Sequence, residues 1–165
     1  VRENGGQYTH AVTWLLWALA ELGEYELAWA LVSEALPLGH SDTPEHALRY
    51  RLEPYFTAAD IYTAPGQEGR GGWSAYTGSA AWLYTVILEQ LLGLQKQGAH
   101  IALRPHVPAA WEGFALTLHV GASTWHLQAR RDLTYVTLDG EKAEDGLVAL
   151  FDDGRIHEAS FPLRN

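Results

Sequence analysis

The residues best suited to chemistry gather in a polar loop at the start of the chain. The stretch ENGGQYTH, residues 3–10, combines an acid, amides, two glycines, a tyrosine and a histidine just before an apolar segment. Gly5 and Gly6 can adopt positive φ and let the backbone approach a ligand closely. The imidazole of His10 can donate a hydrogen bond to an anion or to a hydroxyl group. The alternative is structural, with Gln7 and His10 capping the following helix and satisfying buried backbone groups.

A second polar loop precedes the last predicted helix. The segment GRGGWSAYTGSAAW, residues 69–82, places Thr77, Gly78 and Ser79 at the helix start. Backbone N–H groups lack intrahelical partners there, and the helix dipole is positive. A hydroxyl beside a glycine at such a position is suited to binding phosphate, although the segment lacks the GK[ST] sequence of the nucleotide-binding P-loop. A threonine N-cap is the structural alternative for Thr77.

Two aromatic-rich loops, each at a helix start and each able to bind an anion, indicate one shared pocket. Tyr8, Trp73 and Tyr76 offer flat apolar faces with free polar edges, which suit the stacking of sugar rings. Together with Gln7 they are candidate sugar ligands. Four further tryptophans are interpreted as core packing: Trp14, Trp17, Trp29 and Trp82.

Other catalytic constellations are weak in this sequence. None of the eight histidines belongs to an HExxH motif, and no carboxylate spacing predicts a metal site. Ser79 lacks the GxSxG context of a serine hydrolase. Glu3, Glu53 and Asp60 are the acids nearest to the polar loops and could bind a sugar hydroxyl. Glu53 before Pro54, and Asp60 inside a predicted apolar helix, fit structural roles equally well.

Composition indicates a soluble globular protein. The 165 residues are 47% hydrophobic and 19% charged, which is typical of a folded domain and not of a disordered tail. The formal charge of -9 disfavours nucleic acid as a partner, because its phosphates repel an acidic surface. The absence of cysteine excludes disulfides and thiolate metal sites. The longest apolar run, AVTWLLWALAEL, has about half of the roughly 20 residues that a bilayer span needs, so no membrane contact is expected.

The first ~95 residues follow a helical period of apolar side chains. Four helices are expected: 14–22, ended by Gly23; 25–36, stopped by Pro37; from 43 towards 62, interrupted near Pro54; and 78–92. Thr43 and Pro44 suit the N-cap and the first helical position of the third helix. The helices are apolar on nearly all sides, which predicts burial on two faces and a larger helical assembly.

From about residue 99 the apolar period changes to two, which predicts strands. Six are expected: 100–105, 114–120, 123–131, 134–140, 147–154 and 155–163. Two-residue turns are predicted at Gly121-Ala122 and Asp153-Gly154, and the acids of EKAEDG and FDDG are interpreted as solvated turn residues. This third of the chain is therefore predicted to form an antiparallel sandwich or small barrel, separated from the helices by a polar boundary near LQKQGA.

The segments RENGGQYTHA, EPYFTAADIYTAPGQEGRGGWSAYTGSAAW and DDGRIHEASFPL resemble, in order and spacing, the C-terminal part of glycoside hydrolase family 94. That family contains cellobiose and chitobiose phosphorylases and the phosphorylase-like domain of cyclic β-1,2-glucan synthases; GRGGWSAYTGSA is more similar to the synthase branch. The resemblance implies an α+β multi-domain fragment. Residues 1–97 would hold the last helices of an (α/α)6 catalytic barrel, and residues 98–165 a C-terminal antiparallel β-sandwich. An upstream barrel half or another chain would cover the apolar helical face.

The resemblance also implies inverting phosphorolysis of a β-glucan or β-glucoside oligosaccharide. An aspartic acid protonates the glycosidic oxygen while inorganic phosphate, a co-substrate and not a cofactor, attacks the anomeric carbon and releases an α-sugar 1-phosphate. Because phosphate is already an anion, no base is required to activate water. The general-acid aspartate belongs to a motif upstream of this chain. We therefore expect no catalytic residue among these 165 residues and no activity from them alone.

Position by position, three residues match the phosphate ligands of that family: His10, Thr77 and Gly78. Arg2 and Glu3 match residues that bind the sugar in the leaving-group subsite. Some members place a phosphate-binding glutamine near the position of Ala59. Alanine cannot make that contact, which is therefore missing here or comes from another residue, such as Gln67.

Two other functions stay open. A barrel hydrolase that uses water would need a second carboxylate as base and would leave the helix start at Thr77 without an anion. A non-catalytic carbohydrate-binding or scaffolding piece would use the aromatic side chains only to grip sugar. The chain begins at Val1 and has no methionine, so we expect a processed protein or part of a longer one. Its location would be cytoplasmic for a soluble phosphorylase, or that of a membrane-associated parent for a glucan synthase.

Overall fold

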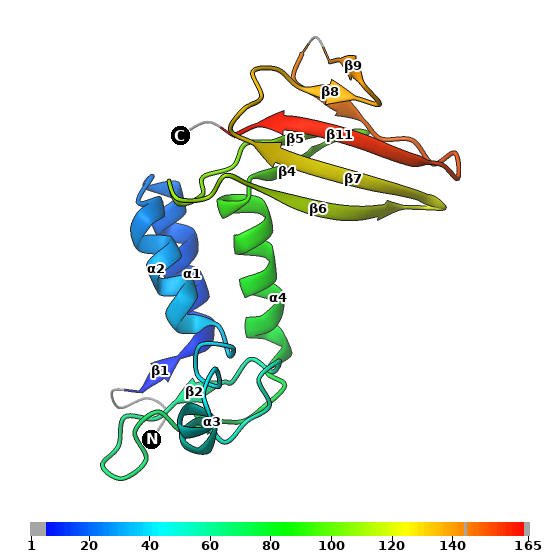
Figure 1. Cartoon of the computed structure of the whole chain (residues 1–165). Coiled ribbons are helices and arrows are strands. Elements are labelled where there is room, and N and C mark those ends of the chain that lie inside the picture. The colour runs from blue at the N-terminus through cyan, green and yellow to red at the C-terminus, as the bar shows by residue number, and fades with distance from the viewer. Residues whose placement is uncertain (1–5, 144, 164–165) are drawn as a thin grey trace. The chain divides into compact units, whose positions relative to one another are not determined.

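The computed structural model describes residues 6–143 and 145–163. It divides into two compact units, Val1–Ile87 and Leu88–Asn165, each of which is treated by itself. Within the described residues, the first unit holds four α-helices and a small sheet, and the second is built mainly from strands (Figure 1). The expectation of a mixed helical and β chain is confirmed. Its division at residue 97 into a barrel part and a sandwich stays a prediction.

The first two helices, α1 (Thr9–Glu21) and α2 (Tyr25–Ala35), lie side by side (Figure 1). Leu16 of α1 and Ala28 of α2 are completely buried. Gly23 has φ +79°, a conformation that glycine adopts without steric cost and that commonly ends helices. Both helices and the residues that end them agree with the sequence prediction, but α1 begins at Thr9 and not at the predicted residue 14. Of the described helices, none is long and apolar enough to cross a bilayer.

The third helix, α3 (Pro44–Tyr50), begins as predicted but ends early. The Thr43 hydroxyl accepts a backbone N–H of the first turn at 3.1 Å. Arg51 then adopts the left-handed conformation, with φ 60°, which terminates the helix. The predicted continuation towards Tyr62 is wrong, because Asp60–Ile61 form the extended strand β2.

A three-stranded antiparallel sheet joins distant parts of the first unit. Its strands are β1 (Gln7–Tyr8), β2 (Asp60–Ile61) and β3 (Gly71–Gly72), in that spatial order. A Cβ atom on Gly72 would collide with the Tyr62 hydroxyl group, and one on Gly71 would collide with the Leu52 side chain. A side chain at either position would therefore force its neighbour to shift.

Backbone hydrogen bonds extend this sheet to the starts of two helices. The Thr9 N–H donates to the Ala59 carbonyl at 3.0 Å, and the Ala59 N–H donates to the Gly72 carbonyl at 3.1 Å. The Tyr76 N–H donates to the Thr57 carbonyl at 3.1 Å. The segment around Ala59 thus fixes both the first turn of α1 and the loop that enters the last helix.

The last helix, α4 (Thr77–Thr85), continues as a π-helical segment, Val86–Leu91, where the sequence predicts a single helix from 78 to 92. Val86 and Leu91 are both completely buried. A π-helix has i→i+5 hydrogen bonds and usually occurs as a short interruption of an α-helix. The apolar period of the sequence does not predict this interruption.

Among its described residues, the second unit contains two sheets. The smaller sheet has the order β10-β5-β4, with strands β4 (Leu94–Gln97), β5 (His100–Leu103) and β10 (Val148–Ala149). The larger sheet has the order β6-β7-β11-β8-β9, with strands β6 (Gly113–Val120), β7 (Ser123–Arg130), β8 (Thr137–Leu138), β9 (Glu141–Lys142) and β11 (Ile156–Pro162). Strand β4 lies where the sequence predicts the polar boundary, and β9 lies where it predicts a solvated turn. Both are mostly exposed and polar, so they lack the apolar alternation that marks a half-buried strand.

One pairing contradicts the prediction of a purely antiparallel sheet. Strand β11 pairs in parallel with β7, in the register His157 with Trp125. The hairpin turn predicted at Asp153-Gly154 is also wrong. The strands on either side of it, β10 and β11, belong to different sheets and do not pair with each other. The predicted two-residue turn at Gly121-Ala122 is confirmed, since Val120 pairs with Ser123 across it.

Alternate residues of the two paired strands form the core of the second unit. Their buried side chains, at most 1% exposed, are Trp125, Leu127 and Ala129 on β7 and Ala159 and Phe161 on β11. Because side chains alternate between faces along a strand, this spacing places the five on one face of the sheet. The period-two prediction for these strands is thus confirmed by burial as well as by backbone.

Gly93 and Gly98 flank β4 and provide a test of the fold. Both have positive φ, +73° and +64°, but a Cβ on Gly93 would also collide with the backbone of Arg104, whereas one on Gly98 meets no atom within 4 Å. The positive φ alone costs roughly 1–2 kcal/mol for alanine. We expect Gly93→Ala to lower the free energy of unfolding by about 1–3 kcal/mol more than Gly98→Ala does. Denaturant titration of the two variants measures both losses. Equal losses for Gly93→Ala and Gly98→Ala would contradict the packing of β4 against this segment.

Candidate functional site

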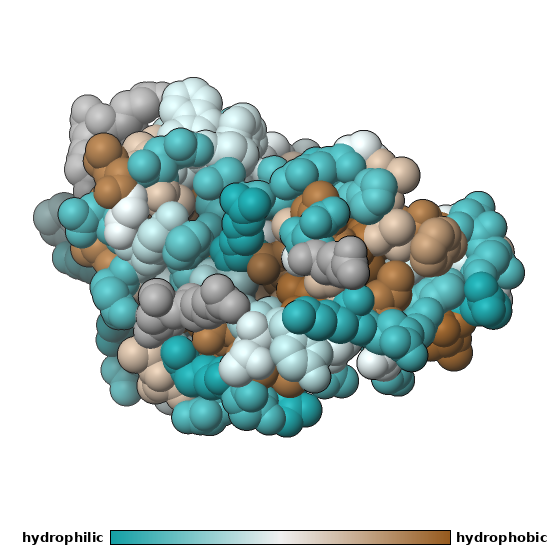
Figure 2. Space-filling view, turned by 90° about the horizontal axis from the view of Figure 1, so that it is seen from above, coloured by the Kyte–Doolittle hydropathy of each residue, from teal (hydrophilic) through white to brown (hydrophobic). Residues whose placement is uncertain are grey.

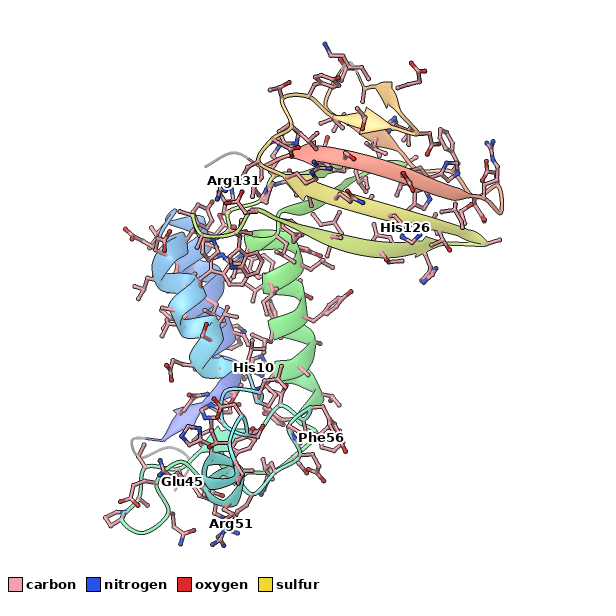
Figure 3. All side chains as sticks on the ribbon, in the orientation of Figure 1. His10, Glu45, Arg51, Phe56, His126 and Arg131 are labelled. Atoms are coloured by element: carbon pink, nitrogen blue, oxygen red, sulfur yellow. The ribbon has the colours of Figure 1, made fainter. Side chains whose placement is uncertain are left out.

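His10 and Gly78, which lie far apart in the sequence, are neighbours in the first unit. His10 is the second residue of α1, and Figure 3 shows it between the starts of α1 and α4. A Cβ atom placed on Gly78 would lie 3.7 Å from Cε1 and 3.8 Å from Nδ1 of the His10 ring. The two polar loops singled out in the sequence therefore meet at one place.

The capping alternatives for these loops do not hold. The N-caps of α1 and α4 are Tyr8 and Tyr76, and neither side chain makes a capping hydrogen bond to its helix. Thr77 is the first helical residue of α4 and not its N-cap. The early N–H groups of both helices therefore lack a side-chain cap. A helix start of this kind keeps the partial positive charge that attracts an anion.

Four buried polar atoms in this part of the molecule have no hydrogen-bond partner among the described residues: Gln7 Nε2, Thr9 Oγ1, His10 Nε2 and Ser79 Oγ. Thr9 and Ser79 are 1% and 0% exposed. A buried polar group without a partner costs roughly 1–3 kcal/mol. All four belong to β1 or to the first turns of α1 and α4. The gathering of such groups in one place is typical of a site whose polar atoms are held ready for a ligand.

Aromatic rings surround His10. Its ring centroid is 5.0 Å from that of Trp14, 6.4 Å from that of Trp82 and 6.4 Å from that of Tyr76. The hydroxyl groups of Tyr8 and Tyr76 are 3.2 Å apart. These rings give the site flat apolar walls, which suit a sugar ring.

Trp14 and Trp82 do not pack in a core within this unit, because their side chains are 58% and 39% exposed. Their position has a simple signal in the sequence: Trp14 lies four residues after His10, and Trp82 lies four residues after Gly78. Residues four apart share one face of a helix. Trp17 and Trp29 are partly buried, and the Trp17 ring packs on Trp82 at 5.5 Å.

The loop before α4 is strained. Trp73 and Ala75 both have φ 54°, in the left-handed region. Residues other than glycine rarely adopt this conformation, which costs of order 1–3 kcal/mol and tends to occur at functional sites. Trp73 is 66% exposed. These strained residues directly precede Tyr76 and Thr77, so the surrounding structure must hold this segment in place.

The other predicted site residues are placed differently. Arg2 and Glu3 lie outside the described residues. Asp60 lies in a strand and not in a helix, and its side chain is 1% exposed. Gln67 lies in an exposed loop, where its Oε1 accepts a hydrogen bond from Arg70 Nη1 at 2.9 Å. A phosphate contact would instead use the Nε2 donor of the amide, which this bond does not involve.

The part of the chain that the structure describes contains no group of three or more histidines, cysteines or acids arranged to hold a metal ion. Ala59 is completely buried. Its backbone serves the sheet, through hydrogen bonds to Thr9, Gly72 and Trp73.

Ala75 gives a test of the strained loop. Glycine adopts φ 54° without penalty, so Ala75→Gly should raise the free energy of unfolding by about 1 kcal/mol. The matched control is Ala80→Gly in the exposed face of α4, which should lower it by roughly 0.5–1 kcal/mol. Thermal and denaturant unfolding of the two variants measures both changes. Destabilisation by Ala75→Gly would show that the loop is not held in the left-handed conformation.

Comparison with known proteins identifies the family of this chain. The sequence profile of the Glycosyl hydrolase 94 superfamily, catalytic domain, matches residues 1–93. Cyclic beta-(1,2)-glucan synthase NdvB of Rhizobium meliloti is 44% identical over 132 residues, which cover 80% of this chain and 5% of that protein. Cellobionic acid phosphorylase of Neurospora crassa is 30% identical over 133 residues, or 78% of this chain and 17% of that protein.

N,N'-diacetylchitobiose phosphorylase of Vibrio proteolyticus is 26% identical over 147 residues, or 85% of this chain and 18% of that protein. The chain thus spans less than a fifth of the length of each of these relatives. The profile match and the two nearer relatives together show that the chain belongs to the glycosyl hydrolase 94 superfamily.

Proposed function

We propose that this chain is the C-terminal part of an inverting β-glucoside or β-glucan phosphorylase. Inorganic phosphate, as co-substrate, attacks the anomeric carbon while the glycosidic bond breaks, and an α-sugar 1-phosphate is released. A general acid outside these residues donates the proton to the departing sugar oxygen. The 44% identity to a cyclic glucan synthase supports a finer proposal, a chain-length-trimming domain within such a synthase. Relatives named as phosphorylases support the reaction type.

One observation carries this proposal: the His10 ring lies against Gly78 at the uncapped start of α4. A small tetrahedral anion can accept hydrogen bonds from an imidazole and from helix N-terminal amides at the same time. His10 Nε2 has no partner among the described residues. We therefore assign phosphate binding to His10, Thr77 and Gly78.

A hydrolase that activates water is less well supported. It needs a carboxylate base that can reach a water molecule beside the sugar. Asp60, one of the acids that the sequence places nearest to the loops, is 1% exposed in β2. Glu53 lies exposed in the segment after α3. Phosphate requires no such base, because it is already an anion.

The sugar is proposed to bind beside the phosphate, against the aromatic walls. Tyr8 is 41% exposed and linked to Tyr76 through their hydroxyl groups. Trp14 is 58% exposed beside His10. Stacking on such rings buries the apolar face of a sugar while its hydroxyl groups stay free for polar contacts. Gln7 and Trp73, and Arg2 and Glu3 outside the described residues, stay candidate sugar ligands.

The helices are proposed to be the last of an (α/α)6 barrel, followed by a C-terminal β-sandwich with one parallel strand pair. Leu15 and Leu27 of α1 and α2 are 49% and 50% exposed, and Leu22 is 77% exposed. Figure 2 shows hydrophobic side chains at the surface between hydrophilic ones. We propose that the remaining barrel helices cover the exposed apolar side chains of α1 and α2.

The test uses a protein in which this chain is joined to the remainder of its catalytic domain. It is incubated with β-1,2-glucan oligosaccharides and inorganic phosphate, and sugar 1-phosphate and its anomeric form are followed by NMR. His10→Ala should lower the rate about a hundredfold or more, as loss of an oxyanion contact does, and should raise the KM for phosphate more than that for glucan. Gly78→Ala should weaken phosphate binding without loss of thermal stability, because its methyl group meets the ring only at ordinary contact distance.

The control is His46→Ala, which removes an exposed histidine of α3 that bonds to Asp42. It should leave the rate unchanged within about twofold, as expected for a surface substitution. Release of reducing sugar without incorporation of phosphate would favour the hydrolase. Turnover that is independent of both phosphate and His10 would overturn the phosphate assignment.

A further inference from the structure

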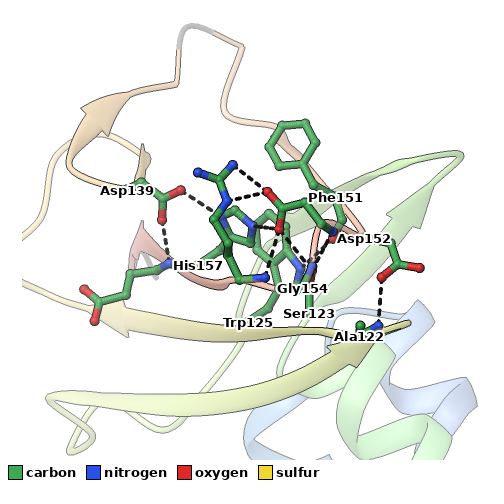
Figure 4. Close-up of polar contacts among 11 residues, drawn as sticks. Ala122, Ser123, Trp125, Asp139, Phe151, Asp152, Gly154 and His157 are labelled. Carbon is green, nitrogen blue, oxygen red and sulfur yellow. Dashed lines mark hydrogen bonds and ion pairs between the residues drawn. The ribbon is translucent and has the colours of Figure 1, made fainter.

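His157 is a buried histidine whose two ring nitrogens both face carboxylates. It lies in β11, with its side chain 3% exposed. Its Nδ1 is 2.8 Å from Asp139 Oδ2 in the β8–β9 turn, and its Nε2 is 3.0 Å from Asp153 Oδ1 in the loop between β10 and β11 (Figure 4). The ring therefore joins two separate loops to one strand.

The number of protons on the ring decides whether both contacts hold. A neutral imidazole carries one N–H and one acceptor nitrogen, and an ionised carboxylate can only accept. In the neutral ring, one of the two nitrogens would face a carboxylate oxygen with no proton between them. Both contacts are hydrogen bonds only when His157 carries two protons and a positive charge.

The two carboxylates are held in place by other donors. Asp139 Oδ1 accepts the Glu158 N–H at 2.8 Å. Asp153 Oδ1 accepts the Arg155 N–H at 3.0 Å, and its Oδ2 accepts Arg155 Nε at 2.6 Å. Neither aspartate can turn away from the ring without the loss of these bonds. The site is thus built for a protonated histidine.

The Asp153 loop is also attached to the β6–β7 hairpin. Ser123 Oγ accepts the N–H groups of Asp153 and Gly154 at 2.9 and 3.0 Å, and Asp152 Oδ1 accepts the Ala122 N–H at 2.7 Å. These bonds hold the loop across the end of the hairpin (Figure 4). A change at His157 therefore acts on a loop that connects both sheets.

The surroundings of the ring favour the cation. His157 stacks on the buried Trp125 indole, with ring centroids 4.3 Å apart and planes 26° apart, an arrangement that attracts a positive charge. From the β8–β9 turn the facing charge is Asp139, and from the β10–β11 loop it is Asp153, which Arg155 partly compensates. From β7 the facing group is the uncharged Trp125. The local balance before protonation is therefore negative.

We propose that Asp139, His157 and Asp153 form a pH-sensitive latch in the second unit, closed while the imidazole is doubly protonated and opened when it loses a proton. When the latch is closed, hydrogen bonds from His157 attach the β8–β9 turn and the β10–β11 loop to β11. When it opens, one carboxylate faces a bare nitrogen lone pair, and the contact between its loop and the ring is lost. This property concerns the second unit only and does not rest on the proposed reaction.

The direction of the pH dependence follows from the pKa shifts. The hydrogen bond to Asp139, followed by that to Asp153, raises the pKa of His157 above its ordinary value of 6.5. A group whose pKa is raised by folding stabilises the fold fully below the unfolded value, and this stabilisation is lost as the pH rises through the folded value. Hydrogen bonds from Arg155 and His157 lower the pKa of Asp153, and one from His157 lowers that of Asp139. Their stabilisation is lost in acid, so the latch is strongest between these limits.

The test compares the complete 165-residue chain with His157→Gln and with the control His119→Gln, an exposed histidine on β6. Thermal unfolding is measured at about pH 6 and about pH 9, on either side of the ordinary histidine pKa of about 6.5. We expect the midpoint of the wild-type second unit to fall over this interval. The fall should be much smaller in His157→Gln and unchanged in His119→Gln.

A second measurement does not depend on the folding of any variant at His157. Nitrogen-15 NMR of the wild-type chain at about pH 7, close to the ordinary histidine pKa, should show both ring nitrogens of His157 protonated. Asp139→Asn keeps the shape of the side chain but removes its charge, and should move the titration midpoint of His157 to lower pH. A single neutral tautomer at that pH, or an equal fall of the unfolding midpoint with and without His157, would overturn the proposal.

Discussion

The contact between the His10 imidazole and Gly78 is the constraint on which the candidate site depends. It brings the first turn of α1 to the first turn of α4, and neither helix start is capped by a side chain. Two partial positive helix ends and an imidazole thus face one region. Glycine at position 78 keeps the space beside the ring open, and the walls of that space are aromatic. An anion beside a sugar is the ligand pair that this combination suits best.

A very small sheet enforces that contact. Strands β1, β2 and β3 have two residues each, yet their backbone bonds fix the start of α1 and the loop before α4 to the same segment around Ala59. Two glycines without room for a Cβ, and two residues in the left-handed conformation, show that this arrangement is packed tightly and strained. The unfavourable local geometry is offset by burial around Tyr50, Ala58 and Ile61.

Local features of the fold follow from the sequence, and non-local ones do not. The end of α1 at Gly23 and the start of α3 at Thr43 depend on neighbouring residues, and both were predictable for that reason. The sheet β1-β2-β3 was not, because two-residue strands carry no alternation and their partners are distant in the sequence. The parallel pairing of β11 with β7 is likewise a property of the whole chain. For the site, residue types indicated the two loops, but the exposure of Trp14 and Trp82 required the structure.

NMR of the isolated chain titrated with inorganic phosphate can show whether His10 and the start of α4 bind the same phosphate ion. We expect the His10 ring signals and the Thr77 and Gly78 amide signals to shift together, with one dissociation constant, and Gly78→Ala to weaken all three responses. Shifts confined to one group, shifts with different dissociation constants, or no shift in either group would contradict binding of a single shared ion.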